Sequence, residues 1–127
     1  MDRAIRVLVA NRPRLMRELV LTTFADQPDI EIVGEVSSDA EIAERVHQTH
    51  PDFLVIALDN PARRPAICDT VLRQHPEMRI IALAPDQGLS SFYWVSFNIH
   101  ASSFEASEES ILNTVRRRLA QQEGRKQ

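Results

Sequence analysis

The chain has 127 residues, of which 43% are hydrophobic and 26% charged, and its formal net charge is −3. This composition is typical of a single globular domain, and it argues against a disordered chain, a second domain or a general affinity for nucleic acid and anionic membranes. The apolar runs are shorter than the roughly 20 residues that cross a bilayer, and the start MDRAIR differs from a signal peptide, so we expect a cytoplasmic protein without membrane contact.

Short apolar runs that predict strands alternate along the chain with segments of helical spacing. The four predicted strands cover residues 5–9, 30–36, 53–58 and 80–84. After the first strand, apolar residues recur at four-residue steps between 15 and 24, which predicts a helix of about three turns with Pro13 in its first turn. Strands that are apolar throughout and alternate with helices indicate a parallel sheet covered on both faces, a doubly wound α/β domain.

Two serines predict the starts of later helices. Ser38, with Glu41 three residues further on, matches a capping box. Ser107 is followed by two glutamates, which the positive end of a helix dipole favours, and the apolar spacing then continues to Leu119. We therefore expect helices that begin close to residues 38 and 107.

The glycines exclude the common nucleotide-binding motifs. The chain contains Gly34, Gly88 and Gly124, and none lies between the first strand and its helix, where a dinucleotide fingerprint or a phosphate loop would need them. No serine stands in a G-x-S-x-G elbow, so a hydrolase is not supported either. Because the sequence suggests no paired nucleophile and base, we expect the chain not to be an enzyme.

The cysteine and the histidines give little support for a metal site. Cys68 is the single cysteine, which excludes an internal disulfide, and we expect it to be an unreactive small residue in a helix. His47 and His50 are three residues apart near a predicted helix end, within reach of one metal ion, but no third ligand follows at a recognisable spacing. Capping of the helix end by charge is the favoured interpretation, and we expect no metal or other cofactor.

Three stretches carry a resemblance to a known family: VLVANRPRLMRELVLTTFADQPDIEIVGEVSSDAE, PDFLVIALDNP and LRQHPEMRIIALA. They resemble the opening, the third strand, and the third helix with the fourth strand of two-component response-regulator receiver domains, of the type that precedes a helix-turn-helix output domain. The resemblance covers about residues 4–120. It implies a flavodoxin-like fold with a five-stranded, doubly wound parallel sheet, a single receiver-like domain over residues 1–120, and a polar, basic tail at 121–127.

The resemblance also implies a phosphorylation site, whose reactive groups are missing here. Receivers take a phosphoryl group from a histidine kinase onto an aspartate, which is surrounded by an acid pair that holds Mg²⁺, a hydroxyl and a lysine. Position by position, the acid pair falls on Ala10 and Asn11. The acceptor falls on Ala57 and the hydroxyl on Ala84, and the only lysine of the chain is Lys126. We call positions 10, 11, 57 and 84 the vestigial site, and we predict that it accepts no phosphate.

Asp59 is the carboxylate nearest to the acceptor position in the sequence. It lies two residues beyond Ala57, so strand alternation would let it face the same side as a displaced acceptor. Turn formation is the favoured interpretation, because Asp59 precedes Asn60 and Pro61. In addition, without acids at positions 10 and 11, no metal would balance the charge of an incoming phosphate.

The string GLSSFYWVSFNIH, residues 88–100, is the most unusual part of the sequence. As a helix after the fourth strand, it would bury most of its large side chains on one arc and leave Trp94 and Val95 outside that arc. Its aromatic and β-branched residues also fit a strand. In receivers this region belongs to the usual docking and dimerisation surface. The resemblance therefore implies a partner interface at Trp94 and Val95, with Phe97 and Phe104 as neighbours.

The favoured interpretation is a phosphorylation-incompetent receiver-like domain of bacterial two-component signalling that acts as a constitutive protein-interaction module. Its partner would be a histidine kinase, another regulator or a second copy of the chain. Two alternatives stay open: the receiver portion of a DNA-binding transcriptional regulator, and a small-molecule sensor that uses the vestigial site with Arg12 and Asp59. The basic end RRRLAQQEGRKQ is interpreted as a solvated helix end and tail, so no nucleic-acid partner is expected.

Overall fold

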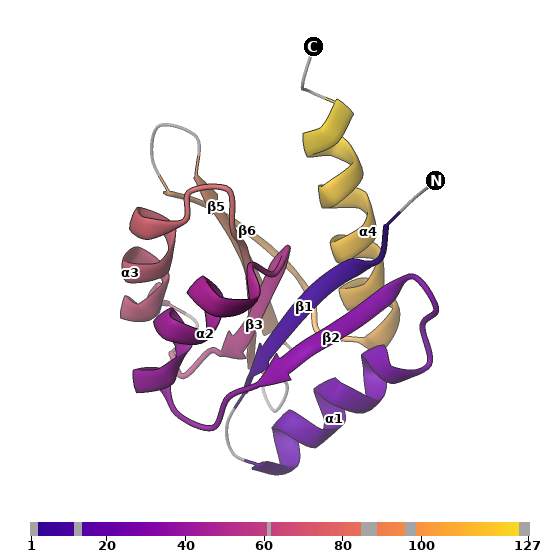
Figure 1. The fold of residues 1–127 in the computed structure, drawn as a ribbon, viewed down its shortest axis with the longest axis horizontal. Helices are drawn as coiled ribbons and strands as arrows, with labels where there is room; N and C mark the ends of the chain where they lie inside the picture. The colour runs from indigo at the N-terminus through magenta and orange to yellow at the C-terminus, as the bar shows by residue number, and fades with distance from the viewer. Residues whose placement is uncertain (1–2, 12–13, 61, 85–88, 96–98, 125–127) are drawn as a thin grey trace.

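The structure, a computed structural model, describes residues 3–11, 14–60, 62–84, 89–95 and 99–124. Within these ranges the chain forms six strands, four α-helices and one short 3₁₀ helix (Figure 1). The strands are β1 (Ile5–Ala10), β2 (Ile30–Glu35), β3 (Phe53–Ala57), β4 (Arg79–Ala84), β5 (Leu89–Val95) and β6 (Ile99–Glu105). The helices are α1 (Arg14–Ala25), α2 (Ile42–Thr49), α3 (Ala66–Gln74) and α4 (Glu108–Gly124), with the 3₁₀ helix η1 (Asp39–Glu41) before α2.

All six strands form one sheet with the order β2-β1-β3-β4-β5-β6. The strands β1 to β4 are parallel to one another, and a helix lies in each connection between them. β5 then runs antiparallel to β4, and β6 runs antiparallel to β5, so β6 points in the same direction as the first four strands. The strand order reverses at β1, so the topological switch point lies between β1 and β3.

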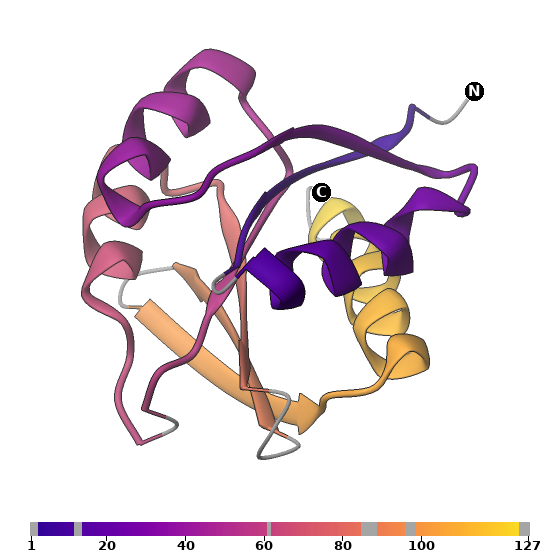
Figure 2. The same cartoon turned by 90° about the horizontal axis from the view of Figure 1, so that it is seen from below.

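Helices cover both faces of the sheet. Figures 1 and 2 show α2 and α3 together on one face, and α1 and α4 on the other. The cluster under α2 and α3 includes Leu8 and Leu72, and the cluster under α1 and α4 includes Phe24, Phe53 and Val115. The central strands β1, β3 and β4 contribute side chains to both clusters, and apart from Arg6 and Arg79 they are apolar, as predicted for parallel strands covered on both faces.

The segment after β4 corrects the predicted five-stranded parallel sheet. The interpretation of the string at 88–100 as a helix is wrong for its described residues, which lie in β5 and β6, and the alternative of a strand is confirmed. β5 pairs antiparallel with β6 from Leu89 opposite Glu105 to Val95 opposite Ile99. Aromatic and β-branched residues favour a pleated surface because their branched or flat side chains pack well against neighbouring strands. A β-hairpin therefore occupies the region where the resemblance implied a helix and a fifth parallel strand.

The helical start expected near residue 38 is confirmed, because Ser38 is the N-cap of η1 and η1 leads directly into α2 at Ile42. Ser38 makes no side-chain capping hydrogen bond, so the capping box itself is wrong. The start near residue 107 is confirmed, because the hydroxyl of Ser107 accepts a hydrogen bond from the backbone N–H of Ser110 at 3.2 Å. Pro13 lies outside the described residues.

α4 continues through Gly124, beyond the domain end predicted at residue 120. Residues 121–124, expected to belong to a tail, are thus the last turn of this helix. No helix in the described ranges, α4 included, combines the length and the apolar character that a membrane span requires.

Cys68 lies in α3 and is fully buried in the cluster beneath α2 and α3. Burial raises the pKa of its thiol to about 12, so the thiol stays protonated and inert at neutral pH. The expectation of an unreactive helical cysteine agrees with this position.

Candidate functional site

The four residues of the vestigial site lie at the carboxyl ends of three neighbouring strands. Ala10 ends β1 and is followed by Asn11, Ala57 ends β3, and Ala84 ends β4. All four are buried, with exposed fractions between 0% for Asn11 and 9% for Ala57. In an open α/β sheet this edge is the usual place for a ligand. Here its three alanines contribute methyl groups, which can neither accept a phosphoryl group nor bind a cation.

Asn11 is the one polar member of the vestigial site, and its amide has a structural role. Its Nδ2 donates a hydrogen bond to the backbone carbonyl of Ile56 at 2.9 Å, which ties the end of β1 to β3. Its Oδ1 is buried and has no hydrogen-bond partner among the described residues. Arg17 reaches the backbone carbonyl of Asn11 at 3.4 Å. A single neutral amide oxygen supplies no charge to balance Mg²⁺, which prefers carboxylates and keeps several waters.

Asp59 is exposed and lies in the loop between β3 and α3, outside the buried vestigial site. This loop lines a pocket of about 350 Å³, formed by Asp59, Asn60, Arg63, Arg64, Pro65 and Ala66. None of the four vestigial residues lines that pocket. The turn chemistry expected at this point is carried by Asn60, whose Oδ1 accepts a hydrogen bond from the N–H of Ala62 at 3.0 Å. Asp59 is thus an exposed residue of this loop, whereas the four residues of the vestigial site are buried.

One of the two arginines in the loop is already paired. Nε of Arg64 donates to a carboxylate oxygen of Asp69 at 2.7 Å, and this hydrogen bond raises the pKa of Arg64 and lowers the pKa of Asp69. The pair links the loop to the first turn of α3. It orders the rim of the pocket rather than offering a free charge to a ligand.

The residues predicted to form a partner interface fall on the hairpin. Trp94 and Val95 belong to β5, opposite His100 and Ile99 of β6, and not to a helix as the first interpretation had it. Phe97 lies outside the described residues. Phe104 is half-buried and packs against the cluster under α1 and α4, so it contributes to the core. Its place in a partner interface stays a prediction.

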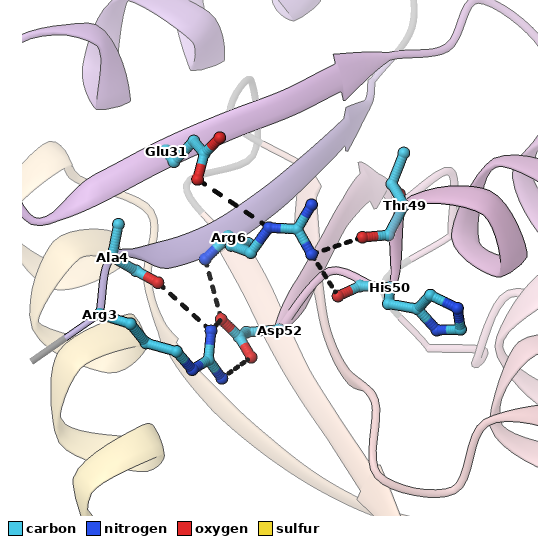
Figure 3. Close-up of polar contacts among 7 residues, drawn as sticks. All are labelled: Arg3, Ala4, Arg6, Glu31, Thr49, His50 and Asp52. Atoms are coloured by element: carbon cyan, nitrogen blue, oxygen red, sulfur yellow. Dashed lines mark hydrogen bonds and ion pairs between the residues drawn. The ribbon is translucent and has the colours of Figure 1, made fainter.

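A second polar cluster lies at the opposite edge of the sheet, where the parallel strands begin (Figure 3). The guanidinium of Arg3 donates to both oxygens of Asp52, at 2.8 and 2.6 Å, and the backbone N–H of Arg6 donates to one of them at 2.9 Å. Burial raises the pKa of Asp52, but these hydrogen bonds outweigh it and leave the pKa below its ordinary value. The cluster fastens the start of β1 to the residue before β3.

Three histidines come together near the same edge. His47 and His50 at the end of α2 meet His75 at the end of α3, with ring centroids 6.0 to 6.4 Å apart. The sequence showed the first two as neighbours but not the third, because His75 reaches them only through the packing of α3 beside α2. The described residues contain no group of three histidine, cysteine, aspartate or glutamate side chains that could hold a metal ion.

Comparison with curated proteins finds partial relatives, although no protein-family profile matches the chain. It is 33% identical over 57 residues to the protein-glutamate methylesterase/protein-glutamine glutaminase of Hydrogenovibrio crunogenus. It is 39% identical over 57 residues to the transcriptional regulatory protein BtsR of Escherichia coli. Each match covers 45% of this chain, but only 15% of the first protein and 24% of the second. The chain thus matches less than a quarter of the length of these relatives.

Comparison with solved structures gives the fold. The response regulator domain of CheB from Thermotoga maritima superposes with a TM-score of 0.52 at 24% identity, over 61% of this chain and 58% of that one. A two-component response regulator of the LuxR family from Aurantimonas sp. SI85-9A1 gives a TM-score of 0.53 at 19% identity, over 61% and 56%. The class is therefore a flavodoxin-like α/β domain. More particularly, the chain has the fold of the receiver domains of two-component response regulators, and the predicted resemblance is confirmed.

Proposed function

We propose that this chain is a receiver-like signalling domain that accepts no phosphoryl group and acts by constitutive binding to another protein. The observation that carries the proposal is the chemistry of the vestigial site. Its three alanines and the buried Asn11 leave no carboxylate at the ends of β1 and β3. The Nδ2 of Asn11 donates to the carbonyl of Ile56, and its Oδ1 is a neutral oxygen that supplies no charge to balance Mg²⁺.

The loss of these groups has a conformational consequence. A phosphorylatable receiver populates two states, and phosphate with Mg²⁺ shifts their balance. Without clustered carboxylates, the site lacks both their mutual repulsion and the ligand that would shift the populations. The domain is then held in a single state, whose contacts with a kinase, a regulator or a second copy do not depend on phosphorylation.

The phosphorylation part of the proposal is tested with acetyl phosphate and Mg²⁺, followed by intact-mass spectrometry. We expect no mass increase, while a phosphorylatable receiver in a parallel reaction gains one phosphoryl group. An increase in the wild type that is absent from Asp59→Asn would identify Asp59 as the acceptor and overturn the proposal. An increase in both would place the acceptor elsewhere and overturn it equally.

The binding part of the proposal places the contact surface on the β5–β6 hairpin. The double variant Trp94→Ser with Val95→Ser is expected to lose self-association in light scattering while keeping its circular dichroism spectrum, because aromatic side chains dominate protein interfaces. Leu19→Ser is the matched control, since Leu19 is a 54% exposed apolar residue on α1, away from the hairpin. Unchanged assembly of the double variant, or equal loss in the control, contradicts the assignment.

The similarity to BtsR favours a second candidate, that the chain is the receiver portion of a transcriptional regulator. An immunoblot of an extract from the native host, with an antibody against this chain, separates the two. A band near the 14.5 kDa of the present chain supports an independent module. A band of substantially higher mass supports the regulator, and binding of that longer protein to promoter DNA would then be measured.

A further inference from the structure

The strand β6 forms one edge of the sheet, and within the described residues its outer side pairs with no other strand. The sheet order ends at β6, whose neighbour on the inner side is β5. Figure 2 shows the β5–β6 hairpin at the margin of the molecule. An edge strand presents backbone N–H and C=O groups that can pair with a further strand, unless the sequence or the fold prevents this.

One hydrogen bond shows which residues of β6 direct their backbone groups outward. The hydroxyl of Ser90 in β5 donates to the carbonyl of Phe104 at 2.7 Å, so this carbonyl points toward β5. The backbone groups of successive residues in an antiparallel strand point to alternate sides. The N–H and C=O groups of Ala101 and Ser103 therefore point away from β5, and both residues are exposed.

The opposite edge strand, β2, has features that prevent further pairing. Its Glu31 and Glu35 are exposed and form ion pairs with Arg6 and Arg17, at 3.9 and 3.3 Å. The pairing of β2 with β1 also contains a register shift. Charged side chains and irregular pairing are common means of protecting an edge strand. In contrast, β6 has the sequence IHASSFE, with one acidic residue at its end and no lysine, arginine or proline, and its register with β5 is regular.

We propose that β6 pairs antiparallel with β6 of a second copy of the chain, so that the two sheets become continuous. This inference rests on the binding part of the proposed function, for which it names the partner and the contact. A two-fold axis at Ser102, perpendicular to the sheet, places Ala101 of each copy opposite Ser103 of the other. Both residues direct their backbone groups outward, so each such pair can exchange two N–H···O hydrogen bonds. The pairing ends at Glu105, whose carbonyl already accepts from the N–H of Ser107 at 3.1 Å.

The aromatic residues of β6 favour this register. Phe104 packs against the cluster under α1 and α4, and strand alternation puts His100 on the same face of the sheet. In the two-fold register, His100 of each copy lies opposite Phe104 of the other copy. Aromatic pairs that face each other across two antiparallel strands stabilise the pairing, and the symmetry provides this contact twice.

The remaining side chains of β6 are compatible with a second copy. Ala101, Ser102 and Ser103, at the centre of the contact, are small, so they allow the two backbones to approach. At each end, Glu105 of one copy lies opposite Ile99 of the other, so no like charges face each other. The strand is therefore complementary to itself, and this is why we assign the partner as a second copy of the chain.

Sedimentation velocity of the full chain over a range of concentrations tests the association. We expect a species of about twice the 14.5 kDa of one chain as the concentration rises. Ser103→Pro removes an outward N–H and should weaken self-association about tenfold or more. An edge strand tolerates proline where the N–H faces solvent, so the fold should persist. Ser103→Ala is the matched control, because it keeps the N–H and should associate like the wild type.

Disulfide formation tests the register. Ser102 would face its own counterpart across the two-fold axis in a non-hydrogen-bonded pair, with Cα atoms about 4.5 Å apart, a distance that a disulfide can span. Ser102→Cys should therefore give a covalent dimer on mild oxidation, seen on a non-reducing gel. Ser103→Cys is the control, because it would lie opposite Ala101 and should cross-link far more slowly. The native Cys68 is buried and should not react.

Three results would overturn the inference. They are a monomer at all concentrations, unchanged association of a folded Ser103→Pro variant, and cross-linking of Ser103→Cys as fast as that of Ser102→Cys. Circular dichroism shows whether Ser103→Pro is folded. If it is not, the comparison of the two cysteine variants decides the question by itself.

Failure of this inference is distinguishable from failure of the proposed function. A monomeric chain excludes the strand pairing but leaves binding to a kinase or a regulator intact as a proposal. Association that is lost in the Trp94→Ser, Val95→Ser double variant and kept in Ser103→Pro also excludes the strand pairing, and it supports a different surface of the hairpin. A phosphoryl group gained from acetyl phosphate contradicts the proposed function without touching the strand pairing.

Discussion

The first four strands and the β5–β6 hairpin belong to one sheet but differ in strand direction and in burial. Strands β1, β3 and β4 are parallel, lie inside the sheet and are covered by helices on both faces, so nearly every side chain in them is buried and apolar. The hairpin is antiparallel and closes one end of the sheet, and it tolerates buried serines. The parallel strands are thus specified by burial on both faces, while the hairpin combines apolar and polar buried positions.

The largest expected effect comes from a cavity in the parallel part. Phe53 is fully buried in β3, and the guanidinium carbon of Arg79 lies 5.8 Å from the centre of its ring. Phe53→Ala should lower the free energy of unfolding by about 3–5 kcal/mol, because it removes buried surface and leaves a void that the rigid sheet cannot fill. Urea unfolding measures the loss, and Phe53→Leu is expected to cost clearly less. A cost below about 1 kcal/mol would mean that this part of the core is loosely packed.

The next effect concerns the polar cluster of Arg3, Arg6 and Asp52, which joins the start of β1 to the residue before β3. Asp52→Asn should cost about 1.5–3 kcal/mol at neutral pH, because it removes charge-assisted hydrogen bonds from Arg3 and the backbone of Arg6 to a carboxylate that is only 11% exposed. The pKa of Asp52 is lowered in the folded state, so its stabilising effect is complete above the unfolded pKa and is lost as the pH falls through the folded pKa.

The matching measurement is urea unfolding of the wild type and of Asp52→Asn from pH 7 to pH 3. The difference between them should stay constant down to about pH 5 and shrink below about pH 4. A difference that grows on acidification would have the wrong sign and would show that the carboxylate is not stabilised by its partners.

A smaller effect is expected inside the hairpin. The hydroxyl of Ser90 donates to the carbonyl of Phe104 at 2.7 Å, and Ser90 is 2% exposed. Ser90→Ala should cost about 1 kcal/mol, the usual net contribution of one buried hydrogen bond. Ser103→Ala, at an exposed position of β6, is the control and should fall within about 0.5 kcal/mol of the wild type. An equal loss of unfolding free energy in the two variants would mean that the buried hydrogen bond of Ser90 adds no measurable stability.

The smallest effect is expected for the ion pair that joins α4 to the first half of the chain. Arg116 donates to both carboxylate oxygens of Asp29, at 2.7 and 2.9 Å, and these bonds lower the pKa of Asp29. Both side chains are about 40% exposed, so Arg116→Gln should cost only about 0.3–1 kcal/mol and less in high salt. A salt-independent loss above 2 kcal/mol would show that the pair is more than a surface contact.

The parallel half of the fold could be predicted from the sequence because its pattern has one physical explanation. Apolar runs such as residues 53–58 are too short for core helices and too apolar for strands with a solvent face, so they indicate central parallel strands. The string at 88–100 has no such unique explanation. Its aromatic residues fit one arc of a helix and also a pleated strand, and pairing with the strand at 99–105 decided between them.

The candidate sites were predictable to the extent that they follow strand ends. Ala10, Ala57 and Ala84 could be placed together because the carboxyl ends of neighbouring parallel strands meet. The approach of His75 to His47 could not be predicted, since it depends on how α3 packs beside α2 and no spacing encodes that. The engagement of Asn11 with Ile56 was also hidden, because a sequence does not reveal which polar groups are consumed by the backbone.

Because Cys68 is buried, its thiol can report local unfolding of the domain. While the native packing is intact, the buried and protonated thiol of Cys68 is inaccessible to disulfide reagents. Labelling then proceeds only through transient local unfolding, so its rate measures how often the packing of α3 against the sheet is lost. As the chain has a single cysteine, that rate is read at one defined place without any engineered probe.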